Sequence, residues 1–210
     1  MLAKWPVMAA IAAVVAGVST PASAITFDFT SDHCSGGCGT PPFGSVTLTQ
    51  NGANVSVDVD LFGTNAFAKT GAADMQAFKF NATGVVLTDI TVTQNASGQT
   101  LAAQTGAFNG DGTGNFSFGI ACTTCGGGSS SAFSTDIIFT VANATIADLT
   151  APNNLGIVFV ADIIGSTGNT GPVDATVAVP APIIGAGLPG LVVACGGLLG
   201  LARRRRQRLA

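Results

Sequence analysis

Residues 54–62 read NVSVDVDLF, in which apolar and polar side chains alternate at every step. One side of an extended chain would carry Val55, Val57, Val59 and Leu61, and the other would carry Ser56, Asp58 and Asp60. A period of two residues is the pattern of a β-strand with one buried and one solvated face. The stretch therefore predicts a strand that covers a hydrophobic core with its valines.

The same alternation recurs along the chain. Further candidate strands are 25–30, 46–49, 85–93, 116–120, 133–141, 156–163 and 173–179. Between them lie turn sequences rich in Asn and Gly, such as Asn51-Gly52 and Gly168-Asn169, which tolerate the positive φ of tight hairpins. The pattern predicts an all-β fold, an antiparallel β-sandwich that is jelly-roll-like or related. A parallel β-solenoid is the alternative, but the sequence has no fixed-period repeat to support it.

Composition agrees with a β-rich exported body. The chain lacks Glu, the usual residue of exposed helix surfaces, and is rich in Thr, Val and Gly. Between residues 25 and 179 there are eleven aspartates and only two basic residues, Lys69 and Lys79, which gives a net charge of −9. Such a surface repels phosphate backbones, so nucleic acid is excluded as a partner.

Residues 1–24 have the three parts of a secretory signal peptide. Lys4 supplies the positive start, residues 7–18 form an apolar run, and Ala22-Ser23-Ala24 offers the small residues that a signal peptidase requires. Ile25 is the expected mature N-terminus. An uncleaved anchor helix is the alternative, although the run is shorter than the roughly 20 residues that span a bilayer.

The C-terminal residues 180–210 predict a membrane tail. Residues 183–202 contain no charge and are long enough to cross a bilayer as one transmembrane helix. A basic cluster follows at Arg203, Arg204, Arg205, Arg206 and Arg208. Positive residues stay in the cytoplasm, so the tail predicts an exported domain of residues 25–179 on the other side of the membrane.

The tail resembles a PEP-CTERM sorting signal. The resemblance rests on Val179-Pro180-Ala181-Pro182, on the Gly- and Leu-rich span, and on the terminal arginines. It implies processing by an exosortase, a membrane-embedded enzyme of bacteria that secrete exopolysaccharide. The family usually has an acidic residue where Ala181 stands, which indicates a variant tail. The resemblance implies an inner-membrane-anchored precursor that reaches the cell envelope or the extracellular matrix, with exopolysaccharide as a possible partner. A tail anchor that is never cut is the alternative.

Four cysteines lie in the exported domain, as the pairs Cys34 and Cys38, and Cys122 and Cys125. In an exported protein such cysteines predict two disulfides. Local pairing would contribute about 2 kcal/mol per loop, whereas a cross-pairing that closes a long loop would contribute roughly 4.6 kcal/mol. The short separations favour local pairing. A zinc site that includes His33 is the alternative, and the oxidising compartment argues against it.

Catalytic patterns are scarce. His33 is the one histidine of the chain, and neither a nucleophile elbow nor a zinc-protease motif occurs. Asp58 and Asp60 are the nearest candidates for a pair of hydrolytic carboxylates, but their place in a strand favours a solvated face. The loop 109–115 has oxygen ligands that suit calcium, although a hairpin turn explains it more simply.

The sequence therefore predicts an exported protein of the envelope or matrix with a structural or adhesive role, no catalytic activity, and no cofactor or metal. A surface module that binds carbohydrate or depends on calcium is the first alternative, and a secreted hydrolase is the second.

Overall fold

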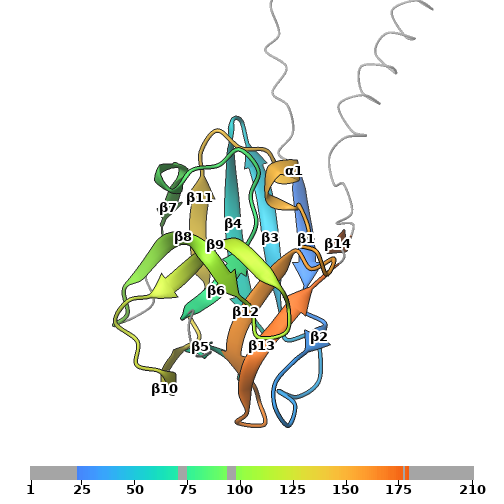
Figure 1. The fold of residues 1–210 in the computed structure, drawn as a ribbon, viewed down its shortest axis with the longest axis vertical. Helices are drawn as coiled ribbons and strands as arrows, with labels where there is room; N and C mark the ends of the chain where they lie inside the picture. The colour runs from blue at the N-terminus through green and yellow to red at the C-terminus, as the bar shows by residue number, and fades with distance from the viewer. Residues whose placement is uncertain (1–22, 71–74, 94–97, 177, 180–210) are drawn as a thin grey trace, which may run out of the picture.

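The computed structural model of the chain describes residues 23–70, 75–93, 98–176 and 178–179. These residues form two antiparallel β-sheets that pack face to face (Figure 1). The predicted β-sandwich is therefore confirmed. Most of the predicted signal peptide, and the tail from Pro180 onward, lie outside the described residues.

Within the described part of the chain, one sheet has six strands in the order β14-β1-β3-β4-β11-β7. Its strands are β1 (Ala24–Asp28), β3 (Gly44–Asn51), β4 (Asn54–Leu61), β7 (Ile90–Val92), β11 (Ile137–Val141) and β14 (Ala178–Val179). β4 contains the sequence NVSVDVDL, and its valines and Leu61 are buried as the alternation predicts. It pairs with β3 through a tight turn at Gly52, whose φ of 62° suits glycine.

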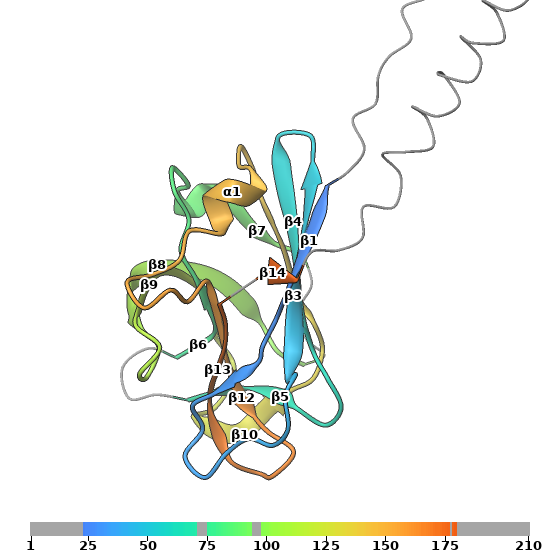
Figure 2. The same cartoon turned by 90° about the vertical axis from the view of Figure 1, so that its right-hand side faces the viewer.

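The other sheet has eight strands among the described residues, with a central order of β10-β5-β12-β6-β9-β8. Its strands are β2 (Ser31–Asp32), β5 (Ala66–Lys69), β6 (Gln76–Phe80), β8 (Leu101–Asn109), β9 (Asn115–Cys122), β10 (Gly128–Phe133), β12 (Phe159–Ile164) and β13 (Thr170–Ala175). One edge of β12 pairs with β13, and its other edge pairs first with β6 and then with β5. Two short helical turns, η1 (Leu87–Asp89) and α1 (Ile146–Leu149), lie in the connections. Figure 2 shows the two layers from the side, with β1, β3 and β4 in one and β6, β8 and β13 in the other.

Phenylalanine rings fill the space between the sheets. The ring of Phe78 lies 5.7 Å from those of Phe80 and Phe159 and 6.0 Å from that of Phe139, measured between centroids. Phe139 comes from β11 of the six-stranded sheet, so these contacts join the two layers. Packed aromatic rings bury a large apolar area, and this cluster is the centre of the hydrophobic core.

Three segments differ from the expected strands. The predicted strand 173–179 is divided between the two sheets, because β13 ends at Ala175 and Ala178–Val179 form β14. The predicted strand 133–141 is split, because the chain turns after β10 and begins β11 only at Ile137. The predicted strand 85–93 forms η1 first and contributes only the three residues of β7. In the segments 85–93 and 133–141 polar residues interrupt the apolar alternation, as Thr88-Asp89 and as Ser134-Thr135-Asp136.

Candidate functional site

The two ends of the β-sandwich pair with each other. In the six-stranded sheet Thr26 pairs with Val179 and Phe27 with Ala178, and in the eight-stranded sheet Ser31 pairs with Asp174 and Asp32 with Val173. The register is continuous from one sheet to the other. Ser31 lies four residues after Phe27, and its partner Asp174 lies four residues before Ala178, the partner of Phe27. We call this arrangement the terminal ladder. It crosses from one sheet to the other where the Thr30 N–H donates to the Asp174 carbonyl at 3.1 Å.

A disulfide loop lies directly after the terminal ladder. Cys34 and Cys38 are bonded to each other, so this pair has the predicted local connectivity. The Asp32 carboxylate accepts the Cys34 N–H at 2.9 Å with one oxygen and the Cys38 N–H at 2.8 Å with the other. The loop is therefore held at both cysteines by one side chain.

The same loop rests on the turn between β12 and β13. Thr167 Oγ1 and Asn169 Nδ2 both donate to the Gly37 carbonyl, at 2.6 and 2.9 Å. A Cβ on Gly165 would lie 2.1 Å from the Cys38 carbonyl oxygen, and one on Gly171 would lie 2.7 Å from Cys34 Cα. Only glycine permits this close approach, so the loop and the hairpin pack as one unit.

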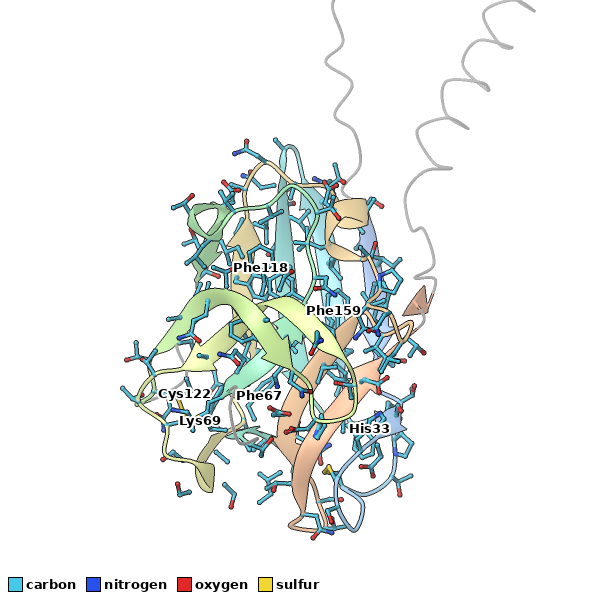
Figure 3. The ribbon with its side chains drawn as sticks, in the orientation of Figure 1. His33, Phe67, Lys69, Phe118, Cys122 and Phe159 are labelled. Carbon is cyan, nitrogen blue, oxygen red and sulfur yellow. A yellow bond between two sulfur atoms is a disulfide. The ribbon has the colours of Figure 1, made fainter. Side chains whose placement is uncertain are left out.

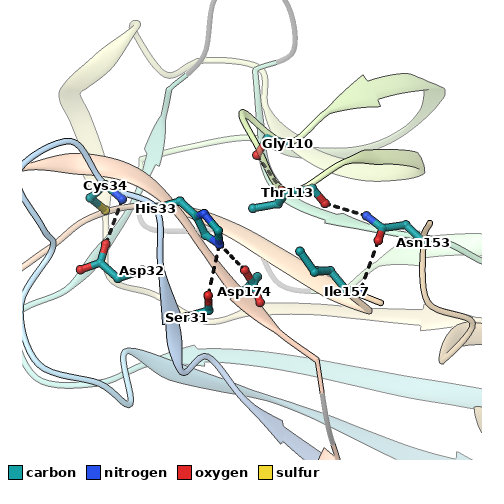
Figure 4. Close-up of polar contacts among 9 residues, drawn as sticks. All are labelled: Ser31, Asp32, His33, Cys34, Gly110, Thr113, Asn153, Ile157 and Asp174. Atoms are coloured by element: carbon teal, nitrogen blue, oxygen red, sulfur yellow. Dashed lines mark hydrogen bonds and ion pairs between the residues drawn. The ribbon is translucent and has the colours of Figure 1, made fainter. Parts of the chain in front are cut away.

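His33 lies beside the disulfide loop and contacts two groups through a single nitrogen. Its Nε2 forms an ion pair with Asp174 Oδ2 and lies 3.2 Å from Ser31 Oγ (Figure 4). Asp174 is 1% exposed, and its Oδ1 has no hydrogen-bond partner in the described part of the chain. A serine-protease triad uses one imidazole nitrogen for the serine and the other for the carboxylate. This Ser-His-Asp group is therefore arranged as a structural contact across the terminal ladder.

The disulfide loop, together with Asp32, could bind a metal ion only if its two cysteines were reduced. Asp32, Cys34 and Cys38 place their ligand atoms within 4.8 Å of one another. Both sulfurs are used in the disulfide, however, and zinc binds cysteine as the thiolate. The His33 imidazole contacts Asp174 through Nε2. The predicted disulfide thus takes the place of the zinc alternative.

The second disulfide, between Cys122 and Cys125, lies at the other side of the eight-stranded sheet. Figure 3 shows Cys122 and Lys69 far from His33. Lys69 Nζ donates to the Cys125 carbonyl at 3.3 Å, which attaches the loop to β5. A redox-active C-x-x-C opens a helix, whereas this one follows a strand and precedes β10. Its role is to close the turn between two strands.

Asp58 and Asp60 lie on the solvent side of β4, as predicted, and Asp136 joins them from the turn just before β11. Burial raises the pKa of Asp58, and the negative charge of Asp136 raises it further. Burial is also the largest cause of the raised pKa of Asp60, followed by the charge of Asp136, a hydrogen bond shared with it, and the charge of Asp58. We call these three carboxyl groups the acidic patch. Such a patch attracts cations and offers oxygen ligands.

The loop 109–115 uses its own oxygens. The Gly110 carbonyl accepts from Thr113, whose hydroxyl lies 2.6 Å away, and the Gly114 carbonyl accepts the Gly110 N–H at 2.8 Å. Asn153 Nδ2 donates to the Thr113 carbonyl at 2.6 Å (Figure 4). These contacts belong to a hairpin turn fixed against the neighbouring loop.

The predicted processing residues lie partly in the described chain. Ala24 and Ile25 are in β1, where Ala24 pairs with Thr49 and the Ser23 carbonyl accepts the Gln50 N–H. Val179 is the last residue of β14. The remaining ones, Ala22, Pro180, Ala181, Pro182, Arg203, Arg204, Arg205, Arg206, Arg208 and the span 183–202, lie outside the described residues. Within the residues that the structure places, no helix has the length and apolar character to cross a bilayer.

Comparison of the chain with protein families, with curated proteins and with solved structures finds no match. The site must therefore be interpreted from its own geometry. Sequence patterns singled out His33 and the cysteines but missed Asp174, Lys79 and Asp162. Each of these three is a charge inside an apolar run, as in Phe78-Lys79-Phe80, and a charge in that setting requires a partner.

Proposed function

We propose that the chain is an exported, non-catalytic protein of the cell envelope or extracellular matrix, with a structural or adhesive role. The observation that carries the proposal is the pairing of Thr26 with Val179. It makes the chain enter and leave the sandwich at the same end. A signal peptide before β1 and a sorting tail after β14 would then hold this one end against the membrane, and the rest of the domain would project away from it.

The polar groups of the domain support a structural role. Asp32 holds the disulfide loop, Asp174 binds His33, and Asp148 caps α1. An enzyme instead needs a nucleophile, a base and an electrophilic group that converge on an open site. Two disulfides also suit an oxidising compartment outside the cytosol.

Export has a consequence for the order of events at the N-terminus. The predicted scissile bond between Ala24 and Ile25 lies in β1, whose backbone is paired with β3. A protease requires backbone that is free of such pairing. Signal-peptide cleavage therefore precedes the addition of β1 to the sheet, and the terminal ladder closes last, after the C-terminal segment has crossed the membrane.

The direct test is intact-mass analysis of the full chain recovered from cells and from the medium of an exosortase-positive bacterium. We expect a product that begins at Ile25, lacks four thiol protons, and has lost the tail beyond the Pro180–Pro182 motif. A Pro180→Ala/Pro182→Ala variant should keep its tail and remain with the inner membrane, whereas Asp111→Ala, remote from the motif, should be processed normally. Full-length chain in the cytosol with reduced cysteines would overturn the proposal.

The acidic patch favours a calcium-dependent binding module as the second candidate. Burial and then the negative charge of Asp136 raise the pKa of Asp58 and of Asp60, and a divalent cation would relieve the charge repulsion. Carbohydrate is less well served, because sugar-binding surfaces use exposed aromatic rings and Phe62 is the one exposed ring among the described residues. The candidate requires that calcium raise the melting temperature of the wild type and not of Asp60→Asn, and that glycan-array binding disappear with a chelator. Failure of both would remove it.

A further inference from the structure

Lys79 and Asp162 form an ion pair from which water is excluded. Lys79 Nζ lies 2.7 Å from Asp162 Oδ2, and both side chains are 0% exposed. The other described ion pair, between His33 and Asp174, has one partner that is a third exposed. Lys79 is also one of only two lysines between residues 25 and 179, so its deep burial is not a consequence of abundance.

The sheet register brings the two side chains together. Lys79 of β6 pairs with Val160 of β12, and Asp162 lies two residues further along the same strand. Residues i and i+2 of a strand share a face, so Lys79 and Asp162 are diagonal neighbours on the face opposite Phe78 and Phe159. The β6–β12 pairing is part of the regular ladder. Backbone hydrogen bonds therefore place the lysine beside the carboxyl group, whether or not the two side chains interact.

Buried side chains also surround the two strands here. Val160, the pairing partner of Lys79, packs with Phe116 and Ile157 in a small apolar cluster. On the other side of Lys79, Gly119 lies opposite it in β9, and a Cβ on Gly119 would come within 2.4 Å of Gln76 Cγ. The Gln76 side chain therefore lies over Gly119, and its Nε2 donates to Gln104 Oε1 at 2.7 Å.

Two opposite charges in such a place are costly, because neither recovers its lost hydration in full. Proton transfer from the ammonium to the carboxylate removes both charges and leaves an amine beside a carboxylic acid. We propose that Lys79 and Asp162 go on to form an intramolecular isopeptide bond. The amine nitrogen attacks Cγ and forms the C–N bond, the C–O bond breaks, and the hydroxyl leaves with one amine proton as water. Atoms and charge balance without an oxidant or co-reactant.

The folded chain supplies the proximity and the exclusion of water that favour this condensation. Aligned groups react when they are held roughly 3–3.5 Å apart, and an amine hydrogen-bonded to a carboxyl oxygen is held near that distance from its carbon. Exclusion of water favours the amide over its hydrolysis. The crosslink would join β6 to β12 close to the point where β12 changes its partner from β6 to β5. It would fix the branch of the eight-stranded sheet covalently.

The test uses the full chain purified after export, reduced to open both disulfides and then unfolded. We expect a mass lower than that of the processed sequence by one water molecule. Trypsin should cleave after Lys69 and not after Lys79, because the modified side chain is no longer recognised. Lys69 is thus an internal control in the same digest. Fragment analysis should show a branched peptide that joins the segment of Lys79 to that of Asp162.

Lys79→Met and Asp162→Ala should each restore the sequence mass, and Asp162→Ala should restore cleavage after Lys79. Lys69→Met and Asp60→Asn, which leave the pair intact, should keep the loss of water. A wild-type chain of full sequence mass that is cleaved after both lysines would overturn the proposal. So would a lost water at Asp111-Gly112, where an aspartate can cyclise on its own backbone, with Lys79 still cleavable.

The crosslink concerns the folded domain and goes beyond the proposed export. Its absence would leave the processing of both ends untouched, and misdirected chain could still carry the bond. Mass analysis of the two ends and of the Lys79 peptide in one sample therefore distinguishes failure of either proposal.

Discussion

Asp60 is a single carboxyl group whose ionisation opposes folding. Its pKa is raised above 3.8, chiefly by burial and then by the charge of Asp136. A folded state that binds the proton more tightly than the unfolded chain loses stability as the pH rises from about 3.8 through the folded pKa. We expect Asp60→Asn to stabilise the domain at pH 7 by about 0.5 kcal/mol, a small gain because solvent screens the patch.

The measurement is urea unfolding of wild type and Asp60→Asn at pH 7 and pH 3. At pH 3 the carboxyl group is protonated in both states, so the two proteins should have the same free energy of unfolding. An equal effect at both values would mean that the change acts through packing and not through charge.

Ionisation of Asp148 favours folding, whereas ionisation of Asp60 opposes it. Its carboxylate accepts the Thr145 N–H at 2.8 Å and the Thr145 hydroxyl at 2.7 Å, and these bonds lower its pKa below 3.8. A lowered folded pKa contributes stability above the unfolded pKa that is lost as the pH falls through the folded value. Asp148→Asn should therefore lower the melting temperature at pH 7 and have less effect at pH 2. A larger effect at pH 2 than at pH 7 would contradict this assignment.

At the scale of an element, the loop that begins at Cys34 depends on Asp32. Asp32→Ala removes a charged acceptor from two backbone N–H groups, and we expect it to cost about 2 kcal/mol of unfolding free energy. Asp32→Asn keeps one acceptor oxygen and should cost less. The Cys34–Cys38 bond should also be reduced faster by dithiothreitol in Asp32→Ala, while Cys122–Cys125 keeps its rate. Equal acceleration of both bonds would indicate general loosening of the domain.

The alternation of apolar and polar residues predicts strands only where one face is solvated. β4 and β3 have such a face, and the sequence pattern located both. All five residues of β6 are buried, so its sequence QAFKF carries no alternation and was missed. β10 begins with Gly and Ser, which have low strand propensity, and it forms because it pairs with β5.

The candidate site shows a similar division. Short-range features were predictable. The short separation of Cys34 and Cys38 favours a bond between them, and the structure has this bond. His33 stood out as the one histidine, but its partner Asp174 is 141 positions away. Only the register of the terminal ladder places them together, and no local pattern encodes a pairing between the two ends of a chain.

At the scale of the molecule, the terminal ladder closes one side of the sandwich. The first segment leaves the six-stranded sheet at β1 and enters the other sheet at β2, while the last segment makes the reverse crossing from β13 to β14. Each layer thus contains a strand from both ends of the domain. The closure depends on contacts between segments from opposite ends of the chain, and His33 and Asp174 provide its one described ion pair.

His33 and Asp174 should therefore be coupled in stability. His33→Gln leaves the buried Asp174 carboxylate without its ion-pair partner, and we expect a cost of about 2 kcal/mol, below the usual 3–5 because His33 itself is partly solvated. Asp174→Asn alone should cost less, since it removes the charge. The free-energy cost of the double variant should be lower than the sum of the two single costs by about 1 kcal/mol or more, as expected for groups in contact. Urea unfolding of the wild type, the two single variants and the double variant measures this coupling. Strictly additive costs would show that the contact does not couple the two ends of the domain.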